Sequence, residues 1–220
     1  MAMKVKKVLY FILMLLPLAV TLIALQFLPD QIPAHYGFDN QVTRWGSKYE
    51  TLVFPALSIV TGLIMLVIAN VSRKQEKDGE NNYKICMMAG MLSLGLFNVM
   101  TCYFLYTDFA QVENLNDMTV DMNGMIFGIL GICLIVLGNI MPKAKMNSLL
   151  GLRTSWSMSS EKAWRKCQRF GGIASMVSGA AMIVACFVTR GMLCTVLALG
   201  IIAVMVIADV CYSYKAAESK

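Results

Sequence analysis

The chain has 220 residues, of which 58% are hydrophobic and 15% are charged, and its mean hydropathy is +0.64. Soluble globular domains contain roughly 45–50% apolar residues, so this composition argues against an ordinary soluble domain and predicts an integral membrane protein. The net charge of +6 comes mostly from a few loops, and no nucleic-acid-binding motif accompanies it. It therefore predicts attraction to anionic lipid or to an acidic protein surface, and no direct nucleic-acid binding.

Six apolar runs are long enough to cross a bilayer, which takes about 20 residues. The first run lacks a small-x-small cleavage site, so we expect a retained helix and not a signal peptide. Little polar sequence remains for an appended domain. The predicted fold is therefore all-α: a six-transmembrane-helix bundle forming one polytopic domain over residues 1–220, with two helices in block 1–71 and four in block 85–212. The runs are Val8–Leu28, Thr51–Val71, Ile85–Tyr106, Val120–Met141, Phe170–Val188 and Met192–Tyr212.

Lysine and arginine residues are unevenly distributed between alternate connections. The two termini and the connections 72–84 and 142–169 carry sixteen of them, whereas the connections 29–50, 107–119 and 189–191 carry three. Cytoplasmic loops of membrane proteins carry an excess of these residues. The distribution therefore predicts that both termini and the two basic connections are cytoplasmic.

The first outer loop, residues 29–50, is rich in turn-forming, aromatic and charged residues. Pro33 disfavours helix before it, and Gly37 and Asn40 can adopt positive φ, so we expect a compact lid. A tryptophan there is also typical of the aromatic belt at a membrane surface. A purely structural lid and a peptide-binding lid both remain open. The candidate binding residues are Pro33, His35, Gly37, Arg44, Trp45 and Lys48.

His35 is the chain's only histidine, and zinc sites typically take about three protein ligands. A hydrogen-bonded loop histidine is therefore favoured over a metal ligand or a general base. The 18 methionines are scattered through apolar runs, where flexible packing explains them without copper. We predict no catalytic residue, no metal and no cofactor.

The connection 142–169 contains seven cations between two apolar runs. Ser159 or Ser160 can cap a short interfacial helix with Glu161 in its first turn. Arg153 could bind phosphate, and tryptophans could anchor the loop at the membrane surface. Anchoring to anionic lipid alone and binding of a soluble partner both remain open. The candidate residues are Asn139, Asn147, Gly151, Arg153, Thr154, Trp156, Trp164 and Arg165.

Small residues recur at spacings near three and four in the fourth and fifth runs, which predicts close helix packing. They are Gly124, Gly128 and Gly131, then Gly171, Ser175, Ser178 and Gly179. Packing within the chain is favoured over a dimer face, although a homodimer remains open.

Two further features lie near the ends of the last runs. Asp209 is expected near the inner membrane surface, where it could pair with a cation of the large basic loop. Cys186 and Cys194 flank a short outer turn and could form a disulfide, although the other cysteines are expected to be small buried hydrophobes.

Both loops resemble the SdpI family of bacterial membrane immunity proteins, and the likeness covers nearly the whole chain. The outer block is similar to the domain of unknown function associated with that family, through Leu28-Pro29, Ile32-Pro33, His35, Gly37 and Arg44-Trp45-Gly46-Ser47-Lys48. The inner block is similar through Gly138-Asn139, Asn147, Gly151-Leu152-Arg153-Thr154, Trp156 and Trp164. The usual turn glycine is replaced by Asn40, and the proline after the Arg-Thr pair by Ser155.

The resemblance implies a plasma-membrane protein that protects a bacterium against a secreted toxic peptide. In some members it also implies capture of a cytoplasmic winged-helix repressor at the membrane. The outer loop would meet the peptide, and the basic inner loop would present the repressor-binding surface. The alternative is a transporter or channel for a peptide or small solute, for which a polar site at mid-membrane or an internal repeat would be expected. Neither is evident in the sequence.

Overall fold

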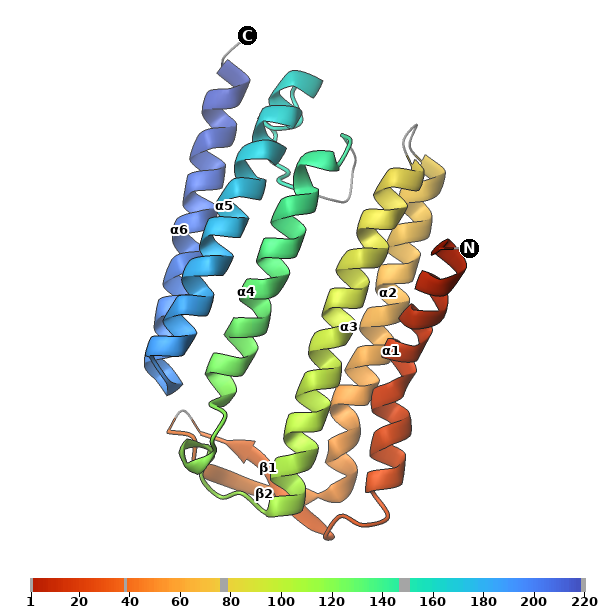
Figure 1. Cartoon of the computed structure of the whole chain (residues 1–220), viewed down its shortest axis with the longest axis vertical. Helices are drawn as coiled ribbons and strands as arrows, with labels where there is room; N and C mark the ends of the chain where they lie inside the picture. Colours follow the sequence, from red (N-terminus) through yellow and green to blue (C-terminus); the bar gives the residue numbers. More distant parts are fainter. Residues whose placement is uncertain (1, 38, 76–78, 147–150, 219–220) are drawn as a thin grey trace. The chain divides into compact units, whose positions relative to one another are not determined.

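A computed structural model describes residues 2–37, 39–75, 79–146 and 151–218. It is mostly helical, and six of the described helices are long and apolar enough to span a membrane, as predicted (Figure 1). The structure adds a two-stranded sheet to the predicted all-α fold. The elements are α1 Ala2–Ala24, β1 Gln31–Tyr36, β2 Val42–Ser47, η1 Lys48–Leu52, α2 Val53–Gln75, α3 Gly79–Ala110, η2 Leu115–Asp117, α4 Met122–Ile140, η3 Met141–Lys143, α5 Glu161–Val188 and α6 Gly191–Glu218.

The basic connection contains no separate interfacial helix among its described residues, so that part of the prediction needs correction. Ser160 caps a helix as expected, because its side chain accepts a hydrogen bond from the backbone N–H of Ala163. That helix is α5 itself, which continues without a break from Glu161 to Val188. The glycines at 171 and 172 do not end it: a Cβ on Gly172 would lie 2.6 Å from the carbonyl oxygen of Gly138 in α4, and one on Gly171 would lie 2.8 Å from the side chain of Met141 in η3.

Contacts divide the chain into two compact units. The first unit, residues 1–67 and 87–122, contains α1, most of α2 and α3, and the sheet. The second unit, residues 68–86 and 123–220, contains nearly all of α4, with α5 and α6. The expectation of one polytopic domain stays a prediction.

The first unit is held by side chains that hydrogen-bond to the backbone of neighbouring helices. Pro17 lies inside α1, and because it has no N–H it leaves the carbonyl of Leu13 without its usual helical donor. Asn98 of α3 donates to that carbonyl at 2.8 Å. Tyr10, fully buried, donates to the carbonyl of Gly62 in α2 at 2.7 Å. An unpaired carbonyl is costly in lipid, so these bonds explain why polar residues occur in apolar helices.

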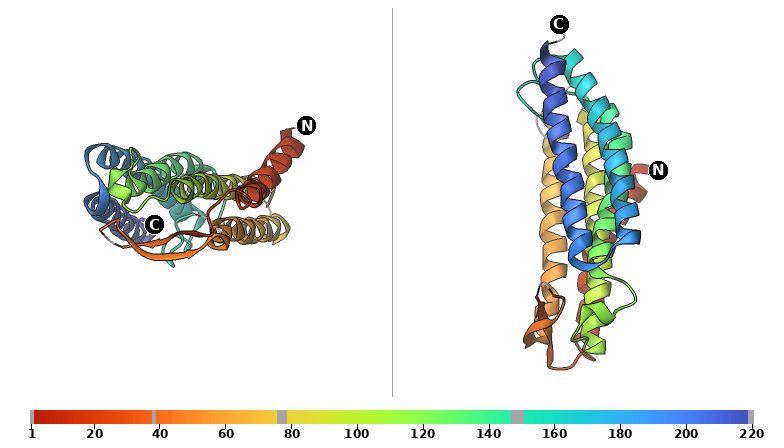
Figure 2. Two further views of the ribbon diagram at one scale, coloured as in Figure 1. Left: turned by 90° about the horizontal axis from the view of Figure 1, so that it is seen from below. Right: turned by 90° about the vertical axis from the view of Figure 1, so that its left-hand side faces the viewer.

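The second unit is held by close backbone approach. A Cβ atom on Gly138 would lie 2.5 Å from the carbonyl oxygen of Gly172, and one on Gly131 would lie 2.7 Å from that of Gly179. The predicted close packing of α4 and α5 is therefore confirmed at Gly131 and Gly179, whereas a Cβ on Gly128 would meet nothing within 4 Å. Helices α5 and α6 run alongside each other (Figure 2), and the rings of Phe170 and Tyr212 stack between them with centroids 4.0 Å apart.

Candidate functional site

The first outer loop is an antiparallel β-hairpin at the end of the first unit where α1 and α3 finish and α2 begins (Figure 1). Pro33 pairs with Trp45 and His35 with Arg44, with register shifts between Pro33 and Tyr36. Pro33 is buried, whereas His35, Arg44 and Trp45 are exposed. A proline within a strand is tolerated at an edge or a bulge, and this two-stranded sheet offers both. The expected lid is therefore compact, but strands form it.

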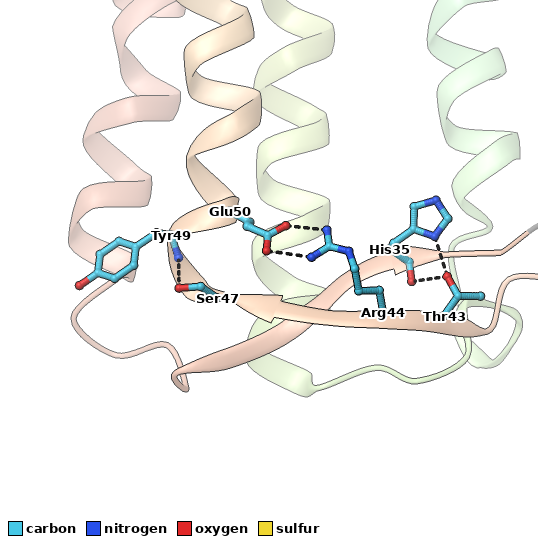
Figure 3. Close-up of polar contacts among 6 residues, drawn as sticks. All are labelled: His35, Thr43, Arg44, Ser47, Tyr49 and Glu50. Carbon is cyan, nitrogen blue, oxygen red and sulfur yellow. Dashed lines mark hydrogen bonds and ion pairs between the residues drawn. The ribbon is translucent and has the colours of Figure 1, made fainter.

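Arg44 forms a two-pronged ion pair with Glu50, which follows the hairpin in η1 (Figure 3). Its two terminal nitrogens donate to the two carboxylate oxygens at 3.0 and 2.7 Å. The hydrogen bonds and charge of Glu50 raise the pKa of the Arg44 guanidinium. Gly46 leaves room for this pair, because a Cβ there would collide with the Glu50 carboxylate and with Ala34. The pair joins β2 to η1, which directly precedes α2.

Lys48 is paired as well. Its ammonium lies 2.9 Å from the carboxylate of Asp30, and its backbone N–H donates to the Asp30 carbonyl at 3.1 Å. Between these two cations, the hydroxyl of Ser47 accepts from the N–H of Tyr49 and caps η1 (Figure 3). The Arg44-Trp45-Gly46-Ser47-Lys48 motif is thus the junction that joins the hairpin to α2, and both of its cations have partners within the loop.

His35 is hydrogen-bonded to Thr43 on the opposite strand, at 2.6 Å between Nδ1 and Oγ1 (Figure 3). The Thr43 hydroxyl itself donates to the His35 carbonyl at 3.3 Å, so Nδ1 is assigned as the donor and Nε2 is left as an acceptor. The described residues contain no group of three or more histidine, cysteine or acidic side chains able to hold a metal.

The tip of the hairpin is tied to the connection after α3, a segment to which the sequence prediction gave no role. Asn40 has the expected positive φ of 65°, whereas Gly37 does not. The amide of Asn40 donates to Asn116 at 2.8 Å, and the N–H of Leu115 donates to the Asn40 carbonyl at 2.9 Å. Tyr36 donates to the carbonyl of Val112 at 2.8 Å. Burial raises the pKa of Tyr36, a hydrogen bond with Thr107 lowers it, and the charge of Asp108 adds to the increase.

A cavity of about 410 Å³ lies between the hairpin and the helix ends of the same unit. Most of its wall is apolar, including Phe54 and Phe104, whose rings stack with centroids 4.9 Å apart. Its polar lining includes the Arg44–Glu50 pair, His35 and Tyr36, together with Asp108 near the end of α3. Sequence reasoning missed Asp108, because an acidic residue at the edge of an apolar run resembles an ordinary helix end.

In the second unit, Gly151 and Gln168 hold the part of the basic connection that begins at residue 151. Gly151 has a φ of +91°, and a Cβ on it would collide with the side-chain amide of Gln168. That amide, fully buried, accepts from the N–H of Leu152 and donates to its carbonyl, each at 3.0 Å. The backbone of Leu152 is therefore paired on both sides, and glycine is required where the chain turns beside Gln168.

Thr154 organises the following turn. The N–H of Thr154 donates to the hydroxyl of Ser157, and the N–H of Ser157 donates to the hydroxyl of Thr154, both at 2.9 Å. The Thr154 hydroxyl also reaches Ser213 of α6 at 3.0 Å. Gly151 and Thr154 are thus scaffold residues that attach the basic connection to α5 and α6.

The remaining candidate residues of the inner block differ in their solvent exposure. Trp164 is 2% exposed and its indole N–H donates to the carbonyl of Ala144 at 2.9 Å, which favours a positioning role over a contact surface. Arg153, Trp156 and Arg165 are exposed. The Trp156 ring meets Tyr214 edge-on with centroids 5.4 Å apart, and Arg165 lies 3.6 Å from Glu161. Asn139 is exposed near the end of α4, and Asn147 lies outside the described residues.

Two further predictions concern Asp209 and the two cysteines that flank the short turn between α5 and α6. Asp209 is 7% exposed, and its Oδ1 atom has no hydrogen-bond partner among the described residues. The ion pairs within that part of the chain do not include Asp209, so the suggested pairing with the basic connection is absent from this structure. The sulfur atoms of Cys186 and Cys194 lie 3.4 Å apart, and no disulfide joins them in this structure.

Comparison with known proteins matches each motif block separately. The model of the SdpI/YfhL protein family matches residues 143–213, and that of a domain of unknown function, DUF1648, matches residues 12–59. The chain is 23% identical to Immunity protein SdpI of Bacillus subtilis (strain 168) over 184 residues, which are 84% of this chain and 83% of that protein. No solved structure matches the chain. The resemblance drawn from the two loops is confirmed, and with six potential spans it identifies a multi-pass protein of the bacterial membrane.

Proposed function

We propose that this SdpI-family membrane protein is an immunity protein that protects a bacterium against a secreted toxic peptide. The observation that carries the proposal is the similarity to Immunity protein SdpI over 84% of the chain, together with family matches to both motif blocks. A chance match to one apolar helix would not extend over loops and helices alike. The proposal assigns no catalytic step to the chain.

The proposal includes an orientation. Both termini and the two basic connections lie in the cytoplasm, supported by the sixteen cations on that side against three on the other. The hairpin then faces the exterior, where a secreted peptide arrives. It meets the peptide with the exposed faces of His35 and Trp45 and with the cavity beneath the strands.

On the cytoplasmic side, the basic connection presents Arg153, Trp156 and Arg165 to a winged-helix transcriptional repressor. Their exposure supports this role, because scaffold residues such as Gln168 supply the internal hydrogen bonds of the segment. The same cations and Trp156 hold the segment against anionic lipid, with the first turns of α5 near the membrane surface. Peptide binding outside and repressor binding inside are linked only if the two ligands favour the same conformation.

The test is survival of a toxin-sensitive bacterium that expresses the chain, across a panel of secreted antimicrobial peptides. Wild type is compared with Arg44→Ala and Arg153→Ala at matched membrane abundance. We expect wild type to protect against at least one peptide, Arg44→Ala to reduce protection, and Arg153→Ala to retain it. If the correctly inserted wild type protects against none of the peptides, the proposal is contradicted. The next measurement is then gradient-driven flux in proteoliposomes, which would identify a transporter.

The repressor role needs a separate readout. In cells that also carry a candidate winged-helix repressor and a reporter under its control, the toxic peptide should induce the reporter with wild type and not with Arg153→Ala. Arg190→Ala removes an exposed cation from the short turn between α5 and α6 and is the matched control. If the peptide induces the reporter equally in cells with Arg153→Ala and in cells with Arg190→Ala, the basic connection does not recruit the repressor.

A further inference from the structure

The carboxylate of Asp108 is the most unusual group in the cavity beneath the hairpin. The residue is 2% exposed and lines the cavity. Among the described residues, the ion pairs do not include Asp108, and the hydrogen bonds that reach it from Gln111 go to its backbone carbonyl and not to its carboxylate. It also lies in the last turn of α3, where the helix dipole disfavours a negative charge. Burial of an ionised carboxylate without a partner is expensive, and a helix end that needed only a polar residue would be served better by a neutral one.

The other charged groups of the cavity cannot compensate for Asp108, because they are already paired. Arg44 is held by both oxygens of Glu50, so this pair contributes no net charge. The ring of His35 is bonded to Thr43, and the phenol of Tyr36 donates to a backbone carbonyl. The cavity therefore combines an apolar wall with one acidic side chain that has no ion-pair partner among the described residues.

Size and lining define the ligand that would complete this site. A cavity of about 410 Å³ is near the lower end of the roughly 300–1,000 Å³ of small-molecule sites, so it holds one or two side chains and not a whole peptide. A cation fits beside Asp108, and the faces of Phe54 and Phe104 favour a cation or an apolar neighbour of it.

We propose that this cavity binds an ammonium group of the toxic peptide, with Asp108 as the counter-charge and the Phe54–Phe104 stack as the wall for an adjacent apolar group. The inference rests on the proposed function for the identity of the ligand. Its chemistry is independent of that function, since any ammonium-bearing group of this size meets the same cavity. Lysine side chains and a free amino terminus share this chemistry.

The experiment titrates three small probes into the full-length protein in lipid nanodiscs, followed by saturation-transfer NMR. Phenylalanine amide presents an amino-terminal ammonium, N-acetyl-lysine amide presents a side-chain ammonium, and N-acetyl-phenylalanine amide is the neutral control. The protein variants are Asp108→Asn, which keeps the shape and removes the charge, and Asp117→Asn, which removes an exposed carboxylate from η2 as the matched control.

We expect at least one ammonium probe to bind wild type and Asp117→Asn about tenfold or more tightly than the neutral probe, and to lose roughly that factor in Asp108→Asn, because a hydrogen bond to a charged group is lost. The probe that binds identifies the source of the ammonium. Equal binding of charged and neutral probes, or unchanged binding in Asp108→Asn, overturns the proposal.

Thermal stability separates a binding role from a structural one. Removal of an uncompensated buried charge should leave the Tm of Asp108→Asn equal to or above that of wild type. A marked fall in Tm would show that Asp108 supports the fold and would also overturn the proposal. Survival assays distinguish the two levels: probe binding without protection contradicts the immunity function and leaves the ammonium site standing, whereas protection that Asp108→Asn retains in full contradicts the site alone.

Discussion

The two units of the chain use polar residues in opposite ways. In the first unit the charged side chains of the hairpin neutralise one another, as in Arg44–Glu50 and Lys48–Asp30, and polar side chains in the helices repair the backbone. In the second unit neutral groups such as Gln168 form the scaffold, and the cations of the basic connection are mostly exposed. A surface built of paired charges is expected to recognise a ligand through shape and a buried group, whereas a surface of exposed cations is expected to recognise it through charge.

The largest effect should come from the glycine contacts of the second unit. Gly138→Leu forces a side chain against the carbonyl of Gly172, so we expect about 3 kcal/mol of destabilisation and reduced membrane abundance. Gly128→Leu lies on the same helix with nothing within 4 Å and should be close to neutral. Unfolding in graded denaturing detergent measures both variants. Equal effects of the two variants would mean that the close approach at Gly138 does not stabilise the second unit.

The scaffold of the basic connection should be the next most sensitive. Gln168→Leu removes both hydrogen bonds to the backbone of Leu152, and we expect about 2 kcal/mol of destabilisation, because a polar group left unpaired retains its desolvation cost. Arg165→Gln, an exposed change one turn away, is the control. The same unfolding assay applies. A loss no larger than that of Arg165→Gln would remove the distinction between scaffold and displayed residues.

Loss of the hydrogen bond from Asn98 to the Leu13 carbonyl of α1 should have a smaller effect on stability, and that effect should depend on Pro17. Asn98→Leu leaves the Leu13 carbonyl unpaired, and we expect about 1 kcal/mol of destabilisation, in the range of interhelical hydrogen bonds in membranes. Pro17→Ala restores an N–H to α1 and supplies the missing helical donor. A double-mutant cycle should therefore show a smaller cost of Asn98→Leu in the Pro17→Ala background. Additive costs would indicate that Asn98 does not compensate for the proline.

The smallest change in stability is expected at the ion pair that holds the hairpin, because both side chains are partly exposed. Arg44→Glu places two carboxylates together and should reduce protection against the toxic peptide, and adding Glu50→Arg should restore most of it. Survival at matched membrane abundance is the measurement. If the double variant protects no better than Arg44→Glu, the guanidinium of Arg44 itself contacts the ligand. The hairpin would then recognise its ligand through a cation, as is proposed for the basic connection.

Several parts of this picture follow from the sequence because they depend on local chemistry. The six spans follow from apolar runs, Ser160 caps a helix because its hydroxyl can accept from the first turn, and Asn40 takes positive φ where a turn demands it. The hairpin was not predicted, because Pro33 and the register shifts around His35 interrupt the alternation that indicates strands. The predicted short interfacial helix is instead the first part of α5, which continues through Gly172. Periodicity in the sequence cannot show that Gly172 packs against Gly138 of α4.

By itself, the sequence determined that this chain spans a membrane, which connections are basic and which two motif blocks it shares with the SdpI family, since all three depend on residue types in order. Tertiary structure alone decided which members of those motifs are available. Arg44 and Lys48 are engaged by Glu50 and Asp30, and Trp164 is buried against Ala144. It also placed Asp108 in the cavity beneath the hairpin. The physical reason is that pairing, burial and desolvation depend on groups brought together from distant parts of the chain.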